Sequence, residues 1–427
     1  MKKQQGKETI LKIDLKQGKG ITLIALVITI IILIILATVT LNVVLGEGGL
    51  IDRIQQAKYL TEQAALEEQE SLNTLMDEYA NMMAEDNIIP EPPRIPETVE
   101  EAKNEGIRFE DTTKLEDDNG NEVWIPGGFE IDEESAIDAD DGIVITDGIN
   151  EFVWIPVPDY TTMYQEAPGT KLTGVETTTD VYSKFKIREG ENYISGMPGD
   201  SDYMTLKEPD VLEEYDTEEQ YYSILEYNNI EEMAKGIVTE YTETYNSIKK
   251  YKGFYIGRYE LTGTVENPTV KRGQAILTEN WYYLKKACSN IVTTEYAQST
   301  MIYGNQWDRV LEWIIETGDK TDYQVNEDST DWGNSKNSTG AAAIDSGIEQ
   351  TAGKNEAWKA NNIYDLAGNH YEFTQTAFTG LNTRIYVNGC WHSTGTYDHA
   401  SKRHTSYLST GEYSNTSSRP ALYIKVK

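Results

Sequence analysis

Residues 362–374 read Asn-Ile-Tyr-Asp-Leu-Ala-Gly-Asn-His-Tyr-Glu-Phe-Thr, and they form the most specific short stretch of this sequence. The Gly-Asn pair at its centre predicts a turn. Asp365 and Glu372 bracket that turn, and their carboxylates, together with the carbonyl oxygens of Gly368 and His370, would suit Ca²⁺, which prefers oxygen ligands. In the alternative interpretation, the two carboxylates only cap and solvate the turn.

Short aromatic runs precede this stretch along the chain. Residues 122–126 (Glu-Val-Trp-Ile-Pro), 152–156 (Phe-Val-Trp-Ile-Pro) and 253–260 (Gly-Phe-Tyr-Ile-Gly-Arg-Tyr-Glu) are typical of short strands between turns. Residues 303–313 predict a helix. Four apolar side chains fall on one face of that helix and are therefore expected in the core, namely Trp307, Val310, Leu311 and Ile314.

Taken in this order, the pieces resemble the formylglycine-generating enzyme (sulfatase-modifying factor) family, whose fold is a variant of the C-type lectin fold. The resemblance runs from about Phe152 to the C-terminus. The family's Gly-Gly-Ser-Trp turn corresponds to residues 388–391 (Asn-Gly-Cys-Trp), and its closing Gly-Phe-Arg corresponds to residues 417–419 (Ser-Ser-Arg). The resemblance implies an α+β fold with short strands, few helices and long loops, and a structural rather than chemical role for calcium.

The chemistry of that family is not expected here. Its oxidase reaction uses two nearby cysteines that bind copper, because soft thiolates select Cu(I). Alignment on the turn puts Ser393 and Asp398 near those positions, and neither can replace a thiolate. Cys288 and Cys390 are the chain's two cysteines, which excludes a four-cysteine zinc site and leaves one disulfide open. We therefore expect no catalytic residues.

The four histidines fall between His370 and His404, which raises the alternative of a non-heme iron or zinc site. Their spacing matches no ligand motif such as H-E-x-x-H. A formylglycine-generating or related metal-dependent oxidase therefore stays as the second hypothesis.

Residues 382–418 are rich in Asn, Tyr, His, Ser, Thr, Asp and Gly. Binding surfaces favour this composition, because Tyr gives a large contact area at low entropy cost and Ser, Gly and Asn give adaptable hydrogen bonds. The segment also resembles the variable region of proteins that diversity-generating retroelements diversify, many of which use a lectin-like scaffold. The alternative is a fixed, polar, loop-rich C-terminus. The predicted ligand-binding face consists of Tyr386, Asn388, Trp391, His392, Tyr397, His399, His404, Tyr407 and Tyr413.

The net charge of −34 excludes binding to a phosphate backbone, which needs clustered Lys and Arg. Nucleic acid is therefore not expected as a partner. Basic residues gather instead in the first 20 residues, ahead of an uncharged run over residues 21–46. At about 1.5 Å per residue this run can cross the roughly 30 Å hydrocarbon core of a bilayer. The positive-inside rule then places the large C-terminal part outside a bacterial cell.

The junction Gly20-Ile21 resembles the leader of type IV prepilins, in which a peptidase cuts after a Gly and leaves the hydrophobic helix on the mature protein. The resemblance implies cleavage between Gly20 and Ile21 and implies pilus subunits as partners. Prepilins typically carry Glu at the fifth mature position, and Ala25 stands there instead, which puts assembly into a major pilus in doubt. The alternative is an uncleaved membrane anchor.

The remaining composition predicts the order of domains. A basic leader covers residues 1–20, and a hydrophobic helix that continues into an amphipathic stalk covers 21–85. A Pro-rich acidic linker covers 86–115, and the formylglycine-generating-enzyme-like domain covers 116–427, with an acidic insertion at about 160–250.

The leading hypothesis is a non-catalytic surface protein, an adhesin or minor pilin, that binds an unknown protein or glycan. The oxidase described above and a purely structural pilus or pseudopilus subunit are the alternatives.

Overall fold

The computed structural model describes residues 95–164, 194–195, 206–207, 219–378, 383–404 and 409–427. Ile95–Lys427 forms one compact unit. In the described part of the chain, no helix is both long enough and apolar enough to cross a membrane. The predicted leader with Gly20 and Ile21, the hydrophobic run and the stalk lie outside the described residues.

The expected α+β class is confirmed, with many short strands and few helices. The helices are α3 (Val99–Glu105), α4 (Glu219–Ile224), α5 (Ile230–Tyr251), α6 (Trp281–Ser289), α7 (Gly304–Glu316) and α8 (Asp322–Asn326). Single 3₁₀ turns are η1 (Ala139–Asp141), η2 (Tyr160–Thr162), η5 (Gly340–Ala343) and η6 (Glu356–Trp358). Three two-stranded hairpins are β1–β2 (Thr113–Glu116, Glu122–Ile125), β9–β10 (Thr262–Gly263, Pro268–Thr269) and β12–β13 (Lys359–Ala360, Ile363–Tyr364).

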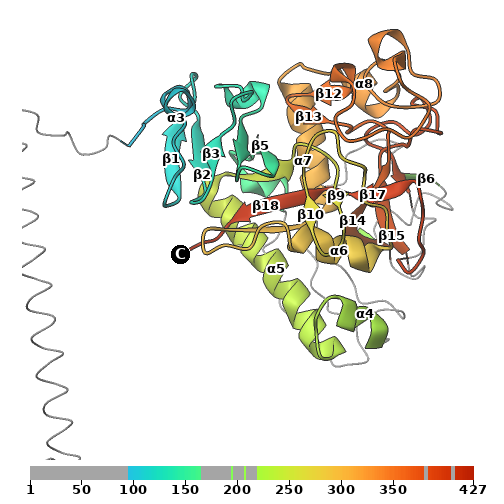
Figure 1. Cartoon of the computed structure of the whole chain (residues 1–427), viewed down its shortest axis with the longest axis horizontal. Coiled ribbons are helices and arrows are strands. Elements are labelled where there is room, and N and C mark those ends of the chain that lie inside the picture. Colours follow the sequence, from blue (N-terminus) through green and yellow to red (C-terminus); the bar gives the residue numbers. More distant parts are fainter. Residues whose placement is uncertain (1–94, 165–193, 196–205, 208–218, 379–382, 405–408) are drawn as a thin grey trace, which may run out of the picture. The chain divides into compact units, whose positions relative to one another are not determined.

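A six-stranded antiparallel sheet forms the centre of the fold (Figure 1). Its spatial order is β11 (Ala297–Met301), β18 (Pro420–Ile424), β8 (Gly253–Gly257), β5 (Glu151–Pro156), β4 (Val144–Thr146) and β3 (Glu130–Ile131). Every residue of β8 and β18 is buried, because apolar clusters cover both faces of the sheet. The last strand of the chain therefore lies inside the sheet, between β11 and β8.

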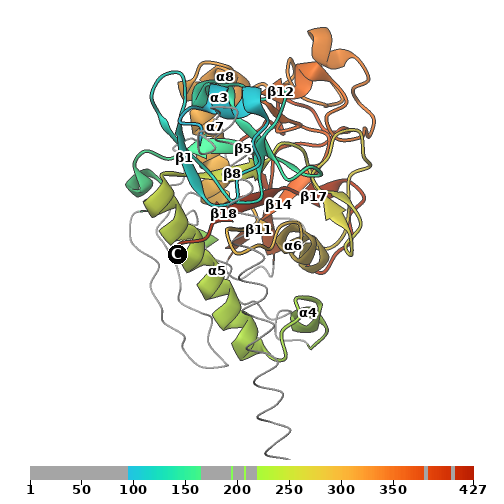
Figure 2. The same cartoon turned by 60° about the vertical axis from the view of Figure 1, so that its left-hand side comes forward.

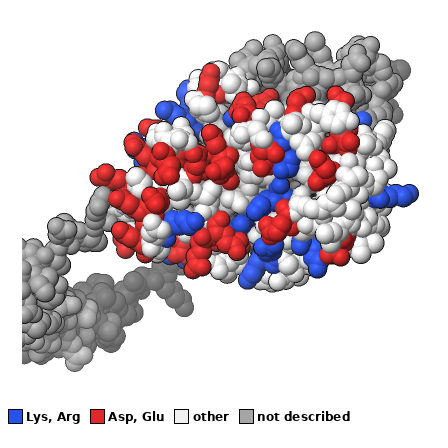
Figure 3. Space-filling model, turned by 90° about the horizontal axis from the view of Figure 1, so that it is seen from above, with Lys and Arg blue, Asp and Glu red and all other residues white. Residues whose placement is uncertain are grey.

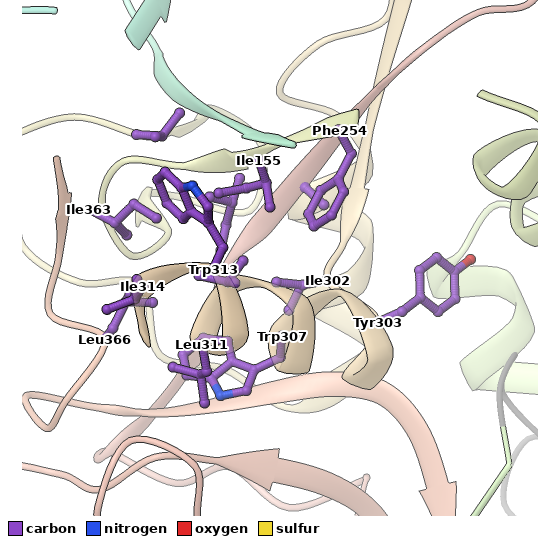
Figure 4. Close-up of a cluster of buried hydrophobic side chains, with 14 of the residues drawn as sticks. Ile155, Phe254, Ile302, Tyr303, Trp307, Leu311, Trp313, Ile314, Ile363 and Leu366 are labelled. Atoms are coloured by element: carbon purple, nitrogen blue, oxygen red, sulfur yellow. The ribbon is translucent and has the colours of Figure 1, made fainter. Parts of the chain in front are cut away.

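Helix α7 packs its apolar stripe against one face of this sheet. Trp307, Val310, Leu311 and Ile314 are all fully buried, as the periodicity predicts. Figure 4 shows Trp307 and Leu311 on the helix below the sheet residues Ile155 and Phe254. Figures 1 and 2 show α5 along β8 and β18, and its contacts with both strands agree.

A second sheet carries the C-terminal part of the chain. Its order is β17 (Thr416–Ser418), β14 (Tyr371–Phe378), β15 (Thr383–Val387), β16 (Arg403–His404) and β6 (Ile194–Ser195), and β7 (Leu206–Lys207) also pairs with β14. Strand β17 runs parallel to β14. Arg419 is the single residue between β17 of this sheet and β18 of the central sheet.

The stretch at 362–374 needs the residue types it has, because several of its residues adopt a left-handed backbone. Asn362, Asp365 and Asn369 have φ angles of 66°, 61° and 62°. Asn and Asp are the non-glycine residues that tolerate this region best. Gly368, at φ 93°, also lies so close to the backbone of Asn334 that a Cβ would stand 2.1 Å from the Asn334 carbonyl oxygen. Both the positive φ angle and this close approach therefore exclude any residue other than glycine at position 368.

Two boundaries differ from the sequence prediction. Residues 95–115, predicted as part of the linker, belong to the compact unit, where they form α3 and most of β1 and pack Val99 and Leu115 into its core. The predicted insertion at about 160–250 ends in α5, whose Tyr241 and Ile248 lie in the main core. The last part of the predicted insertion therefore belongs to the core of the domain.

A buried ion pair joins the two sheets. Arg419 Nη2 donates to Glu372 Oε1 over 2.7 Å and to the carbonyl oxygen of Tyr364 over 2.8 Å. Its Nη1 donates to the carbonyl oxygen of Gly257 over 3.0 Å. Both charged side chains are completely buried. One guanidinium therefore ties β14, β13 and β8 together at the junction of β17 and β18.

We expect Arg419→Met to destabilise the fold by about 3–5 kcal/mol, since it leaves Glu372 and two carbonyl oxygens buried without their donor. Denaturant unfolding of the full chain, followed by tryptophan fluorescence, measures the change. Lys427→Met is the matched control, because Lys427 pairs with Glu295 at 3.3 Å on the exposed surface. The control should stay within about 0.5 kcal/mol of the wild type, and equal losses in both variants would contradict a special role for Arg419.

Candidate functional site

The carboxylates around the Gly-Asn turn have protein partners. Both oxygens of Glu372 accept from Arg419 Nε, over 3.2 and 3.1 Å. Asp365 Oδ2 accepts from the backbone N–H of Gly353 over 2.7 Å. A third buried carboxylate, Glu260, accepts from Asn369 Nδ2 over 2.6 Å and from the backbone N–H of His370 over 3.1 Å. The turn is thus fixed from the inside by side chains that lie far away in sequence.

Three buried carboxyl groups share one guanidinium at this point, and the pKa of each is raised. Burial is the main cause for Glu260, whose pKa lies well above its ordinary value, and the charges of Asp365 and Glu372 add to it. Burial likewise raises the pKa of Asp365 to about 7. Arg419 opposes the shift at all three groups without cancelling it. Each of these carboxyl groups therefore holds its proton more strongly than it would in water.

The residues around the turn do not fit the calcium site that the sequence predicted. Glu372 has both oxygens engaged by Arg419, and Asp365 has only Oδ1 without a partner. Within the described ranges, no three His, Cys, Asp or Glu side chains converge in a way that could hold a metal ion. The positive charge that calcium was expected to bring is already supplied by Arg419.

The histidines do not gather into one site. His370 is fully buried, and burial lowers its pKa to about 4. His399 is buried with Nδ1 3.0 Å from the Ser401 hydroxyl, and His404 is buried in the second sheet. His392 is exposed, with Nε2 3.0 Å from Asn415 Nδ2. The non-heme metal alternative therefore gains no support from their positions.

Both cysteines are free and buried, which settles the question of a disulfide. Burial raises the pKa of the Cys288 thiol to about 12 and also raises that of Cys390. The thiolate is the form of cysteine that binds metals and attacks disulfides. Neither cysteine is therefore set up for that chemistry at neutral pH.

The predicted binding face divides into a buried and an exposed half. Tyr386, Asn388, His399 and His404 are buried, contrary to the prediction that they face a ligand. The Tyr386 ring stacks on His404 at 4.7 Å between centroids, and Tyr371 meets both rings edge-on. The physical reason is position, since Tyr386 and His404 are cross-strand partners on β15 and β16.

The exposed half consists of four residues. Tyr397 is 62% exposed, His392 is exposed, and Trp391 and Tyr413 are half-buried. Trp391 and His392 meet edge-on at 4.8 Å. The Tyr397 ring lies under Lys402, whose Nζ is 4.7 Å from the ring centroid. Tyr407 lies outside the described residues.

Hydrogen bonds fix the loop that carries these residues. The backbone N–H groups of Tyr397 and Asp398 both donate to the carbonyl oxygen of Thr394, over 3.0 and 2.8 Å. The N–H of Trp391 donates over 2.9 Å to the carbonyl oxygen of Asn369, inside the stretch at 362–374. Tyr397 is therefore presented on a loop with a defined shape.

Sequence reasoning missed a second loop, residues 334–350, that borders this one. Lys336 N donates to the carbonyl oxygen of Ser393 over 2.8 Å, and Gly395 N donates to Asn337 Oδ1 over 2.9 Å. The signal was present, because residues 333–340 read Gly-Asn-Ser-Lys-Asn-Ser-Thr-Gly and share the composition of the C-terminal segment.

Comparisons with known proteins give limited information. No family model matches the chain, and no curated protein matches it in sequence. Among solved structures, it is similar to Major Tropism Determinant I1 Variant (TM-score 0.28, 9% identity) and P3c Variant (0.27, 10%), in each case over 41% of this chain and 51% of that one. It is also similar to Treponema denticola variable protein 1 (0.24, 12%), over 64% of this chain and 84% of that one. The chain thus spans about half the length of the first two, and similarities at this level establish neither a family nor a function.

We expect His404 to make stability pH-dependent. Burial lowers its folded pKa to about 4, below the value of about 6.5 in an unfolded chain. The unfolded state therefore takes up a proton first, and the stability that His404 contributes is full above pH 6.5 and is lost as the pH falls toward 4. His404→Phe keeps an aromatic ring but cannot be protonated.

The difference in unfolding free energy between wild type and His404→Phe should accordingly shift by about 2 kcal/mol in favour of the variant between pH 7.5 and pH 5. Denaturant unfolding at the two pH values measures it. His392→Phe is the control, because an exposed ring changes its surroundings little on folding. A shift of the same size in the control would contradict the assignment to His404.

Proposed function

We propose that this protein is a non-catalytic, surface-displayed ligand-binding protein, an adhesin or minor pilin, and that Trp391, His392, Tyr397 and Tyr413 contact the ligand. The observation that carries the proposal is Tyr397, a large aromatic side chain that is 62% exposed on a loop fixed by hydrogen bonds. Exposed aromatic residues on a rigid loop are costly for solubility and are typical of contact surfaces.

The rigidity of the loop favours binding for an energetic reason. A loop that is already ordered loses little conformational entropy when a ligand arrives. Tyr and Trp add a large contact area with few rotatable bonds, and the neighbouring Ser393, Thr394 and Thr396 offer hydroxyl groups that adapt to a partner. The exposed half of the predicted face therefore combines aromatic and hydroxyl side chains with a rigid backbone, as a recognition surface requires.

Two observations favour binding over catalysis. Ser393 and Asp398 stand near the positions of the paired cysteines that a formylglycine-generating enzyme needs. The chain's own two cysteines are buried, and the pKa of each thiol is raised. The buried histidines His370 and His404 have pKa values lowered to about 4, so that they stay neutral and enclosed near pH 7. The two cysteines, His370 and His404 therefore contribute to the packed interior of the fold rather than to a reactive site.

Display at the surface is part of the proposal and rests on the sequence. The uncharged run at 21–46 would insert in the membrane, and the Lys-rich segment before it would stay inside. Cleavage between Gly20 and Ile21, and pilus subunits as neighbours, follow from the prepilin resemblance and belong to the same proposal.

If the C-terminal segment is diversified, the structure divides its codons into two classes. We expect variation at positions 391, 392, 397 and 413, which are exposed or half-buried. We expect constancy at the buried positions 386, 388 and 404, since substitutions there would disrupt packing. Sequencing codons 382–418 across a population of the source organism tests this. Equal variation in both classes would contradict the division, and an invariant segment would leave a fixed binding face.

Binding itself is tested with the purified full chain on two printed panels, one of folded proteins and one of glycans. Tyr397→Ala and Trp391→Ala should each weaken every specific signal at least about tenfold, because aromatic anchors commonly contribute 2 kcal/mol or more. Ile149→Ala is the control and should change nothing, because Ile149 is 56% exposed on the turn between β4 and β5, outside the proposed face. Signals that survive both loop substitutions would rule out this face.

A further inference from the structure

A cavity of about 580 Å³ lies between the β1–β2 turn, η1, the end of β5 and helix α7. Among its lining residues, Ala139 and Trp313 are buried and Pro158 is exposed, so that apolar surface extends from the core to the solvent. None of the described residues that line it belongs to the binding face proposed above. The cavity is therefore a candidate site that does not depend on the proposed function.

Two basic side chains line the cavity, and both are paired with carboxylates. Arg309 holds Glu316 with two parallel contacts, Nη1 to Oε1 over 3.1 Å and Nη2 to Oε2 over 2.8 Å. Its Nε donates to the carbonyl oxygen of Pro156 over 3.0 Å. Lys252 Nζ lies 3.5 Å from Glu122 Oε2. Because both positive charges are balanced within the wall, the cavity offers little attraction to an anion.

Asp140 is a lining carboxylate that lacks such a partner. In the described part of the chain, no donor or basic group pairs with its side chain. Burial raises the pKa of the Asp140 carboxyl group, and four other carboxylates raise it further, namely Asp138, Asp117, Asp141 and Glu316. A cation beside Asp140 would relieve this repulsion, because an opposite charge favours the ionised form of a carboxyl group.

The surroundings of the cavity also favour a positive charge. Helices α5 and α7 both end there, with Lys252 and Thr317 as their C-cap residues, and a helix C-terminus carries a partial negative charge. Residues 117–141 contain ten Asp or Glu and no Lys or Arg. In Figure 3, carboxylates crowd the left-hand part of the molecule, on the side where Figure 1 has α3 and the β1–β2 hairpin. Such a field raises the local concentration of cations.

The size of the cavity decides which kind of cation fits. Within the described ranges, no three His, Cys, Asp or Glu side chains converge to hold a metal ion. A cavity of about 580 Å³ falls instead in the range of small-molecule sites, which is roughly 300–1,000 Å³. The apolar wall with Pro158 and Trp313 suits a hydrocarbon chain, and Asp140 suits a charged group at the end of that chain.

We propose that this cavity binds a monovalent organic cation carried on a short apolar chain, of which an alkylammonium ion is the simplest, and that Asp140 is its anionic contact. A free amine and the side chain of a lysine residue both present this chemistry. The ammonium group would lie at Asp140, near the C-terminal ends of the two helices, and the chain would cover the apolar wall.

Ligand-observed NMR titration of the full chain compares three probes with the same hydrocarbon chain, namely pentylamine, pentanol and pentanoate. Pentylamine should bind at least about tenfold more tightly than pentanol, and pentanoate should not bind. Asp140→Asn should weaken the binding of pentylamine at least about tenfold. Asp118→Asn is the matched control, because Asp118 is exposed in the same acidic stretch but does not line the cavity. It removes the same charge and should leave binding within about twofold, since solvent screens a charge outside the site.

Equal losses in the two Asp variants would show that the general negative field attracts the amine, and would overturn the assignment to this cavity. Equal binding of pentylamine and pentanol, or binding of pentanoate, would overturn the choice of a cation. A further probe, N-acetyl-lysine amide, identifies the source. Binding that equals that of pentylamine supports a lysine side chain as the occupant, and binding of pentylamine alone supports a free amine. Asp140→Asn should melt no lower than the wild type, because its side chain has no described partner to lose.

Discussion

The ion pair between Glu372 and Arg419 is the interaction on which the rest of this fold depends. It lies where the chain leaves β17 of one sheet and enters β18 of the other, and the guanidinium also binds the carbonyl oxygens of Gly257 and Tyr364. Arginine suits this role because its planar fork can satisfy a carboxylate and two carbonyl groups together. Taking both charges out of water is expensive, so the pair stabilises the fold only because its geometry satisfies nearly every donor.

Hydrogen bonds connect the buried charged cluster around this pair to the exposed face through the Gly-Asn turn. Asn369 connects the buried carboxylate of Glu260 to Asn334, whose amide is 3.0 Å from the Asn369 side-chain oxygen. Asn334 in turn holds the loop that carries Ile348, and the carbonyl oxygen of Asn369 holds Trp391. Because each step is a hydrogen bond between buried groups, the two surface loops take their shape from the core rather than from each other's side chains.

Some of this structure follows from the sequence and some does not. The helical stripe of Trp307 and Leu311 and the turn at Gly368 were predictable, because each depends on local periodicity or on a local backbone requirement. The burial of Tyr386 and His404 was not predictable, since composition alone does not tell which side of a strand faces another layer. The residues around the turn do not fit the predicted calcium site, and this too depends on a contact that composition does not reveal. Arg419 lies 47 residues from Glu372 in sequence, and only the fold brings the guanidinium to the carboxylate.

The division of the predicted face into two halves has a consequence for how such a surface can change. The hydrogen bonds that shape the loop come from main-chain atoms of Thr394 and Gly395 and from partners such as Asn337, not from the exposed ring of Tyr397. The buried rings of Tyr386 and His404 stack on each other in the second sheet and contribute to its packing. Side chains on the surface can therefore be replaced without removing the contacts that position the loop. Under the proposed function, the ligand contacts are thus separated from folding stability. This separation is what a scaffold needs if it is to present different ligand contacts on the same fold.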